Sequence, residues 1–176
     1  MAKKTNTSTK TPRKPRFQKT KSFFGNRQTQ TIIGAFIALF GIFLAASFVS
    51  YLFNWQQDQS QLANFSDRDV TVRNLLGKLG ASLSHLIIYN GFGIASLYVP
   101  FLLFFSGSLL FLKGSLLRIR KFWGWGLLGM VWFSITLAFI AQKNMLLAGI
   151  VGYELNTYLQ QFLGKTGLLL SLFFLL

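Results

Sequence analysis

Few residues in this chain of 176 residues could do chemistry, and they do not gather in one motif. There is no cysteine and only one histidine, His85, so a thiolate metal site and a multi-histidine site are excluded. Gly164-Lys165-Thr166 resembles the end of a phosphate-binding P-loop, but Leu159 stands where that motif needs its first glycine. Because there is no carboxylate pair, nucleophile triad or metal cluster, we expect no enzyme active site and no cofactor in this chain.

The composition indicates a chain that lies in lipid. Hydrophobic residues make up 52% of it and charged residues 12%, whereas a soluble domain carries roughly 25% charged residues. The hydrophobic residues also come in long uncharged blocks. We therefore predict an all-α fold, a polytopic transmembrane helical bundle of three full spans and the start of a fourth, preceded by a disordered basic tail.

The predicted tail covers residues 1–30 and the predicted transmembrane domain covers residues 31–176. The predicted spans are the uncharged blocks, at about 32–53, 86–112 and 122–141, with an incomplete fourth from about 167. The first block has 22 residues and would rise about 33 Å as a helix, enough to cross a hydrocarbon core of about 30 Å. A cleavable signal peptide is disfavoured, because its apolar core would have about 7–15 residues.

The segments between the spans carry apolar residues at helical spacing. The segment 56–85 is neutral overall and turns amphipathic, so we expect a short surface helix before the second span. Its spaced leucines are Leu75, Leu76, Leu79, Leu83 and Leu86. Residues 142–166 are interpreted as a second mixed loop. Its apolar stripe consists of Leu155, Tyr158, Leu159, Phe162 and Leu163.

The basic residues set the expected orientation. The chain has 18 Lys and Arg against 4 Asp and Glu, and nine of the 18 lie in the first 27 residues. The segment 113–121 carries four more, whereas 56–85 carries three and 142–166 carries two. Because basic loops stay in the cytoplasm, we expect the N-terminus and the 113–121 loop on the inner side of a bacterial inner membrane. The tail could also bind DNA, but topology and attraction to anionic lipid account for its charge.

Polar residues inside the spans are few. No Asp, Glu, Lys or Arg lies within any complete predicted span, which argues against a transporter or pump. We interpret His85, at the edge of the second span, as an interfacial polar residue. Pro100 lies in the middle of that span and predicts a helix kink there, while Gly91 and Gly93 suit close helix packing.

Small residues recur on single faces of two spans. In the first span they form a strip spaced for close contact with another helix, which consists of Gly34, Ala38, Gly41 and Ala45. In the third span the same interpretation applies to Gly124, Gly126 and Gly129. We expect these strips to pack within the bundle, with a dimer interface as the alternative.

The run VRNLLGKLGASLSHLIIYNGFGIASLYVPFLLFFSGSLLF (72–111) resembles the second-helix region of the FtsK/SpoIIIE DNA translocases. In that family a glycine-rich N-x-x-G-x-x-G-A stretch enters the helix and a proline follows in mid-helix. The matching residues here are Asn74, Gly77, Gly80, Ala81 and Pro100. A later run resembles the family's approach to its fourth helix, through Gly149, Gly152, Gly164 and Gly167. The resemblance covers roughly residues 30–176, and the Lys-rich tail is most similar to the Bacteroidetes branch.

This resemblance implies a membrane anchor at the division septum, tied to a cytoplasmic hexameric ATPase that pumps DNA and couples chromosome segregation to cell division. ATP, Mg and DNA would bind only to that motor, and homo-oligomers would form through it. The anchor itself would contact the lipid bilayer and septal membrane proteins.

The last apolar run, residues 167–176, would rise only about 15 Å as a helix. We therefore expect the natural protein to continue into a linker, the motor and a DNA-orienting winged-helix domain. The alternative is a stand-alone small multi-pass membrane protein, such as a transporter or an assembly subunit.

Overall fold

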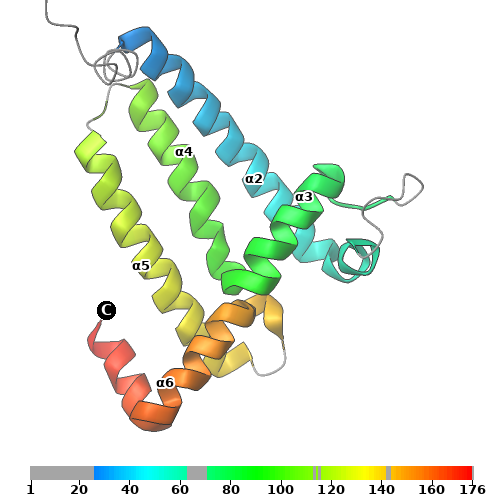
Figure 1. Ribbon diagram of the computed structural model, residues 1–176, viewed down its shortest axis with the longest axis vertical. Helices are drawn as coiled ribbons and strands as arrows, with labels where there is room; N and C mark the ends of the chain where they lie inside the picture. The colour runs from blue at the N-terminus through cyan, green and yellow to red at the C-terminus, as the bar shows by residue number, and fades with distance from the viewer. Residues whose placement is uncertain (1–25, 63–70, 113, 115, 142–143, 176) are drawn as a thin grey trace, which may run out of the picture.

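The computed structural model describes residues 26–62, 71–112, 114, 116–141 and 144–175. All the secondary structure in these residues is helical (Figure 1). The elements are α2 (Arg27–Leu62), α3 (Gly77–Ser84), the π-helical segment η1 (His85–Phe92), the 3₁₀ segment η2 (Gly93–Leu97), α4 (Tyr98–Phe111), α5 (Leu116–Ala141) and α6 (Met145–Phe174). The predicted all-α membrane bundle is confirmed. Most of the predicted tail lies outside the described residues, and the part from Arg27 onward already belongs to α2.

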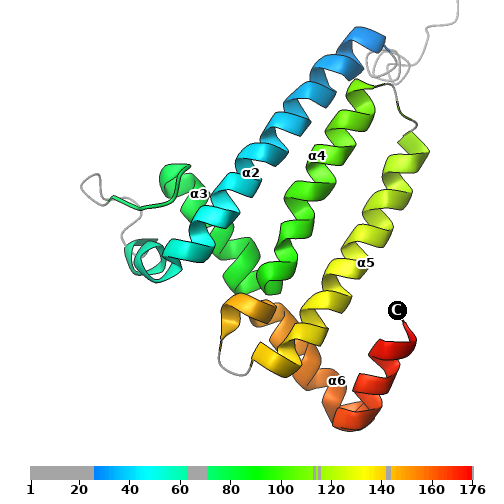
Figure 2. The same ribbon diagram turned by 180° about the vertical axis from the view of Figure 1, so that it is seen from behind.

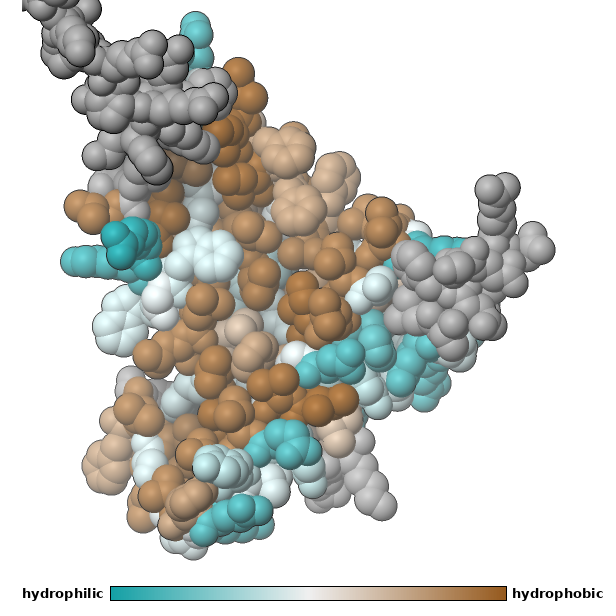
Figure 3. Space-filling model, viewed as in Figure 1, coloured by the Kyte–Doolittle hydropathy of each residue, from teal (hydrophilic) through white to brown (hydrophobic). Residues whose placement is uncertain are grey.

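Three helical segments are long and apolar enough to cross a membrane, namely Arg27–Ser60, Gly77–Phe111 and Leu117–Ala141. Figures 1 and 2 show α2, α4 and α5 running beside one another, with α3 and α6 gathered toward one end of them. This end, which we call the distal end, lies opposite the end of α4 and the start of α5. In Figure 3 hydrophobic side chains cover most of the visible face, and hydrophilic ones gather chiefly at the distal end. The surface is therefore that of a bundle whose sides face lipid.

Helices α2 and α4 approach each other closely enough that only glycine fits at several contacts. A Cβ atom added to Gly34 would lie 2.5 Å from the backbone N of Phe111 and 2.8 Å from the backbone O of Gly107. A Cβ atom added to Gly41 would lie 2.7 Å from the backbone N of Phe104. The small-residue strip of the first span thus faces a neighbouring helix of the same chain, where close backbone approach gains van der Waals contact.

The glycines of the third span differ from one another in their surroundings. A Cβ atom on Gly126 would collide with the side chain of Leu102 on α4, and one on Gly129 would lie 3.8 Å from Tyr98 Cε1. Gly124 has nothing within 4 Å of the equivalent position. Gly124 therefore lies outside the contact between α4 and α5 that the spacing suggested.

The segment predicted as one span over 86–112 contains a sharp bend. The backbone leaves helical geometry at Gly91 (φ −88°, ψ −116°) and adopts φ 63°, ψ −145° at Gly93. Figure 1 shows that α3 and α4 consequently run at a steep angle to each other. Pro100 lies in the first turn of α4, where its missing N–H is tolerated. The bend therefore lies at Gly91–Gly93 and not at Pro100, where the sequence predicted it.

Helix α6 replaces most of the loop that the sequence predicted over 142–166. It begins at Met145, where the Asn144 side chain accepts a hydrogen bond from the backbone N–H of Leu146 (3.1 Å). Non-helical backbone at Gly149 and Gly164 divides it into a first turn, a middle helix over 150–163 and a last part over 165–174. Figure 1 shows the middle helix crossing the distal end and the last part turning back toward α5. The loop prediction was wrong because it rested on polar residues that the structure accommodates within a helix.

We predict that Gly34→Ala lowers the stability of the protein in detergent by about 1–3 kcal/mol, because the new methyl group must push α2 away from the α4 backbone. Gly124→Ala is the matched control, since its methyl group meets open space and Ala favours helix over Gly by about 1 kcal/mol. Thermal unfolding followed by circular dichroism measures both variants. An equal response of the two variants would contradict the α2–α4 contact.

Candidate functional site

The described residues contain no group of three or more His, Cys, Asp or Glu side chains that could hold a metal ion. The most elaborate arrangement of side chains lies instead at the distal end, where α3, η1 and the start of α6 meet α2 and α5. Buried hydrogen bonds and glycine contacts are concentrated there. We therefore take the distal end as the candidate functional site.

A buried polar node fixes the start of α3 against α2. Asn74 is 5% exposed. Its Oδ1 accepts hydrogen bonds from Ser47 Oγ (2.9 Å) and from the backbone N–H of Leu76 (3.1 Å), and its Nδ2 donates to the backbone O of Ser47 (2.9 Å). The hydroxyl oxygens of Ser47 and Ser84 lie 3.0 Å apart. Every polar group of the Asn74 side chain thus finds a protein partner, as burial away from water requires.

Gly80 lets the polar node close. A Cβ atom on Gly80 would lie 2.5 Å from Asn74 Oδ1 and 2.6 Å from Ser47 Oγ. The neighbouring Ala81 is fully buried. Of the residues that carried the family resemblance, Asn74, Gly80 and Ala81 are therefore brought together here, whereas Gly77 has open space around it.

Two further side chains of α2 hold the stretch that leads into α3. Asp58 is fully buried, and its Oδ1 accepts a hydrogen bond from the backbone N–H of Arg73 (2.9 Å). Ser50 Oγ accepts one from the backbone N–H of Leu75 (3.1 Å). Apart from the charge of Asp58, no sequence pattern indicated these roles, because a side chain that bonds to a distant backbone N–H leaves no spacing pattern.

His85 belongs to a row of aromatic side chains between α2 and η1. Its Nδ1 lies 2.8 Å from Tyr51 Oη. Its ring stacks on Tyr89 with a centroid separation of 5.1 Å, and Tyr89 stacks on Trp55 at 5.9 Å. This partnered, packed position agrees with the interpretation of His85 as an interfacial polar residue.

The bend at Gly91–Gly93 touches the bend at Gly149 directly. A Cβ atom on Gly149 (φ 72°) would collide with the backbone O of Gly91 and lie 2.5 Å from the backbone N of Gly93. A Cβ atom on Gly93 (φ 63°) would collide with the backbone O of Leu147 and lie 2.6 Å from the backbone N of Ala148. Two chain reversals far apart in the sequence therefore pack backbone against backbone, which any side chain would prevent.

Helix α6 is tied to α5 by one hydrogen bond just before its middle helix and by another within it. Ser134 Oγ donates to the backbone O of Ala148 (2.6 Å), and a Cβ atom on Gly152 would collide with the same hydroxyl. Asn156, 3% exposed, donates from Nδ2 to the backbone O of Ile135 (2.9 Å). Among the remaining family-motif glycines, Gly164 has open space around it and Gly167 makes an ordinary contact with Leu163 Cβ at 3.5 Å.

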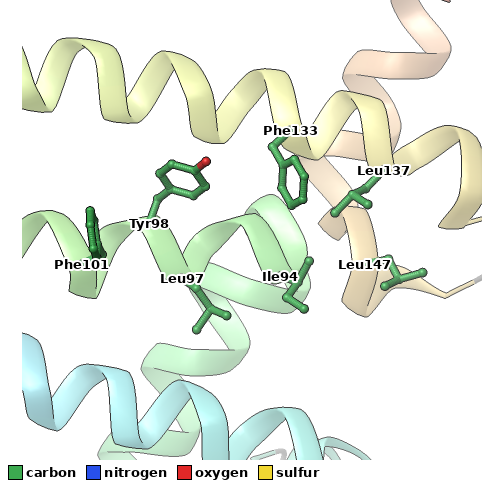
Figure 4. A pocket seen from close by; sticks show the side chains of 7 residues that line it. All are labelled: Ile94, Leu97, Tyr98, Phe101, Phe133, Leu137 and Leu147. Carbon is green, nitrogen blue, oxygen red and sulfur yellow. The ribbon is translucent and has the colours of Figure 1, made fainter. Parts of the chain in front are cut away.

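An apolar cavity of about 580 Å³ separates α4 from α5 beside these contacts. Figure 4 shows Tyr98 of α4 and Phe133 of α5 pointing into the space between the two helices. The remaining lining residues are Ile94, Leu97, Phe101, Leu137 and Leu147. The lining carries no charged group, and the Tyr98 hydroxyl is its one side-chain polar group.

These features define a polytopic helical membrane domain whose distal end is built for close packing. A comparison with protein-family models matches residues 26–176 to the 4TM region of DNA translocase FtsK/SpoIIIE. The chain therefore belongs to the FtsK/SpoIIIE DNA translocase family, as its four-helix membrane region. Neither the curated proteins nor the solved structures provide a match.

We predict that Asn74→Ala destabilises the protein by about 1–3 kcal/mol for each buried group left unpaired. The backbone N–H of Leu76 and the backbone O of Ser47 lose the Asn74 side chain as partner, while Ser47 Oγ keeps only Ser84 Oγ. Asn54→Ala is the matched control, because Asn54 Nδ2 bonds to the backbone O of Ser50 within its own helix. Denaturation by increasing mole fractions of dodecyl sulfate compares the variants. Equal losses of stability in the two variants would show that the polar node contributes no more than a hydrogen bond within one helix.

A second prediction separates backbone strain from close packing. Gly149 and Gly164 share the same unusual backbone (φ 72°, ψ 166° and φ 68°, ψ 165°), which costs other residues about 1–3 kcal/mol. Gly164→Ala should cause this loss alone, because open space surrounds it. Gly149→Ala should cost clearly more or prevent folding, because its methyl group meets the Gly91 carbonyl. Thermal unfolding and expression yield in the membrane fraction give the comparison. A smaller loss for Gly149→Ala would refute the contact between the bends.

Proposed function

We propose that this chain is the membrane anchor of a septal DNA translocase that couples chromosome segregation to cell division. In this proposal ATP-driven DNA pumping is carried by a cytoplasmic motor joined to the anchor. The observation that carries the proposal is the family match over residues 26–176. The described residues support the division of labour, because their buried polar groups serve helix packing and none forms a catalytic arrangement.

The proposed orientation places the N-terminus and the segment 113–121, most of which belongs to α5, on the cytoplasmic side. It places the distal end on the outer side of the inner membrane. Arg118, Arg120 and Lys121 are exposed at the start of α5, where they suit the cytoplasmic surface. Trp123 follows them and donates from Nε1 to Ser106 Oγ of α4 (2.8 Å). This bond holds the basic start of α5 against α4.

The proposed partners follow from the same assignment. The lipid bilayer surrounds the helices, and septal membrane proteins are the partners expected for an anchor that acts at the division site. Oligomerisation, DNA binding and the binding of ATP with Mg are assigned to the motor. In this proposal these activities do not involve the residues described above.

The test is the location of the protein in dividing cells. A fluorescent protein fused to the N-terminus should accumulate at mid-cell as constriction begins, and depletion of the gene product should leave DNA trapped across closing septa. An even distribution around the membrane, with normal nucleoid separation, would support a stand-alone membrane protein instead. Sequence downstream of Leu176 that lacks a Walker A motif would lead to the same rejection.

The proposed orientation can be tested separately with single introduced cysteines, because the chain has no cysteine of its own. A membrane-impermeant maleimide should label Gln56→Cys in intact spheroplasts, and should label Leu117→Cys only after the membrane is permeabilised. The opposite pattern would invert the proposed topology.

A further inference from the structure

Two helices lie across the distal end, α3 and the middle helix of α6, and we call them the surface helices. They share a sequence pattern. Residues 77–84 read GKLGASLS and residues 149–156 read GIVGYELN. Both segments place a glycine at the first and fourth positions, an aliphatic residue at the third, a leucine at the seventh and a small polar residue at the eighth. The second pattern starts α6's middle helix, just as the first starts α3.

The backbone conformations at the ends of the two surface helices also correspond. Gly77 (φ 63°) precedes the first surface helix and Gly93 (φ 63°) follows it, while Gly149 (φ 72°) and Gly164 (φ 68°) bracket the second. In each case a long helix comes before the surface helix and an apolar helix comes after it. The chain thus traces the same course twice, first through α2, α3, η1 and α4, and then through α5 and the parts of α6.

The contacts made by equivalent residues also correspond. Gly80 packs on the hydroxyl of Ser47 in α2, and Gly152 packs on the hydroxyl of Ser134 in α5. Ser84 is fully buried and its Oγ lies 3.0 Å from Ser47 Oγ. Its equivalent is the buried Asn156, which bonds to the residue after Ser134. Both surface helices therefore turn their small and polar side toward the preceding long helix.

The opposite side of each surface helix is apolar and uncovered. The equivalent residues Leu79 and Val151 are 72% and 38% exposed, and the equivalent Leu86 and Tyr158 are 61% and 58% exposed. Phe162, 71% exposed, extends the second row and packs on Tyr158 at a centroid separation of 4.9 Å. In water such rows would be unfavourable, because exposed apolar area is penalised by roughly 25 cal/mol per Å².

The depth of the two helices in the membrane follows from what they pack against. Ser47 lies inside the uncharged stretch 32–53 of α2, and Ser134 lies inside the uncharged stretch 122–141 of α5. The surface helices therefore sit at a level where the long helices are surrounded by lipid.

The length of the returning helix gives the same depth independently. From the Gly93 bend, η2 and α4 cover residues 93–111, which rise about 31 Å together. This matches a hydrocarbon core of about 30 Å. The bend at Gly93, and Gly149 in contact with it, thus lie at the boundary of the hydrocarbon.

We propose that the membrane domain consists of two equivalent units, and that both surface helices lie in the outer leaflet with the rows Leu79–Leu86 and Val151–Tyr158–Phe162 in contact with lipid acyl chains. We assign lipid as the contact of these two apolar rows because the surface helices pack at lipid depth and lead directly into membrane-crossing segments. This arrangement requires the polar residues Ser84 and Asn156 to point inward, as they do. The choice of the outer leaflet rests on the proposed orientation, whereas the contact with lipid does not depend on the proposed septal role.

The test uses single cysteines in the full chain, reconstituted in vesicles of phosphatidylethanolamine and phosphatidylglycerol and labelled with a nitroxide. Cysteines replace Leu79, Leu86, Val151 and Tyr158 one at a time. Phe36→Cys, on the exposed side of α2 (71% exposed), is the lipid reference, and Gln56→Cys is the water reference. The ratio of collision with oxygen to collision with a water-soluble nickel chelate reports the depth of each label.

We expect all four labels to show the ratio of the lipid reference, several-fold above that of Gln56→Cys, and equivalent positions to show matching depths. Ratios near the water reference would overturn the lipid contact. Labels immobile and shielded from both reagents would overturn it in favour of a second protein chain. Lipid contact in one surface helix and water contact in the other would overturn the equivalence of the two units. Each outcome can occur whether or not the protein locates to the septum.

Discussion

Direct contact between two glycine bends holds the parts of this membrane domain in register. Inside lipid a chain can reverse direction only where its freed backbone groups are buried in protein. Here the bend at Gly91–Gly93 and the bend at Gly149 bury each other, because neither carries a side chain at the contact. The position of α6 relative to α4 depends on this contact, and α6 is in turn hydrogen-bonded to α5 through Ser134 and Asn156.

The polar residues of the distal end follow from the same constraint. Asn74, Ser84 and Asn156 are buried, and each bonds to a partner on a neighbouring helix. Apolar residues could fill the same space, but they would not fix the rotation of one helix against another. A buried hydrogen bond with a single acceptable partner does so.

A domain of this kind is suited to anchoring. Most of its buried polar side chains bond to partners within the chain, although the second carboxylate oxygen of the buried Asp58 has none. Such internal contacts favour a rigid support. Membership of the FtsK/SpoIIIE family fits such a support.

The sequence by itself determined the all-α membrane class, because an uncharged helix of about 20 residues is stable in lipid whatever its neighbours are. It also identified Asn74, Gly80 and Gly149 through the family pattern, and it placed a surface helix before the second span. It misplaced the bend at Pro100, since a proline in a first turn disturbs nothing, and it took 142–166 for a loop.

Only the tertiary structure decided what each glycine does. Gly34 meets a helix backbone, Gly124 meets nothing, and Gly149 meets another bend, although all three are the same residue in an apolar setting. The physical reason is that a glycine's role lies in what occupies the space of its missing side chain. That space is filled by residues distant in the chain, which local spacing cannot specify.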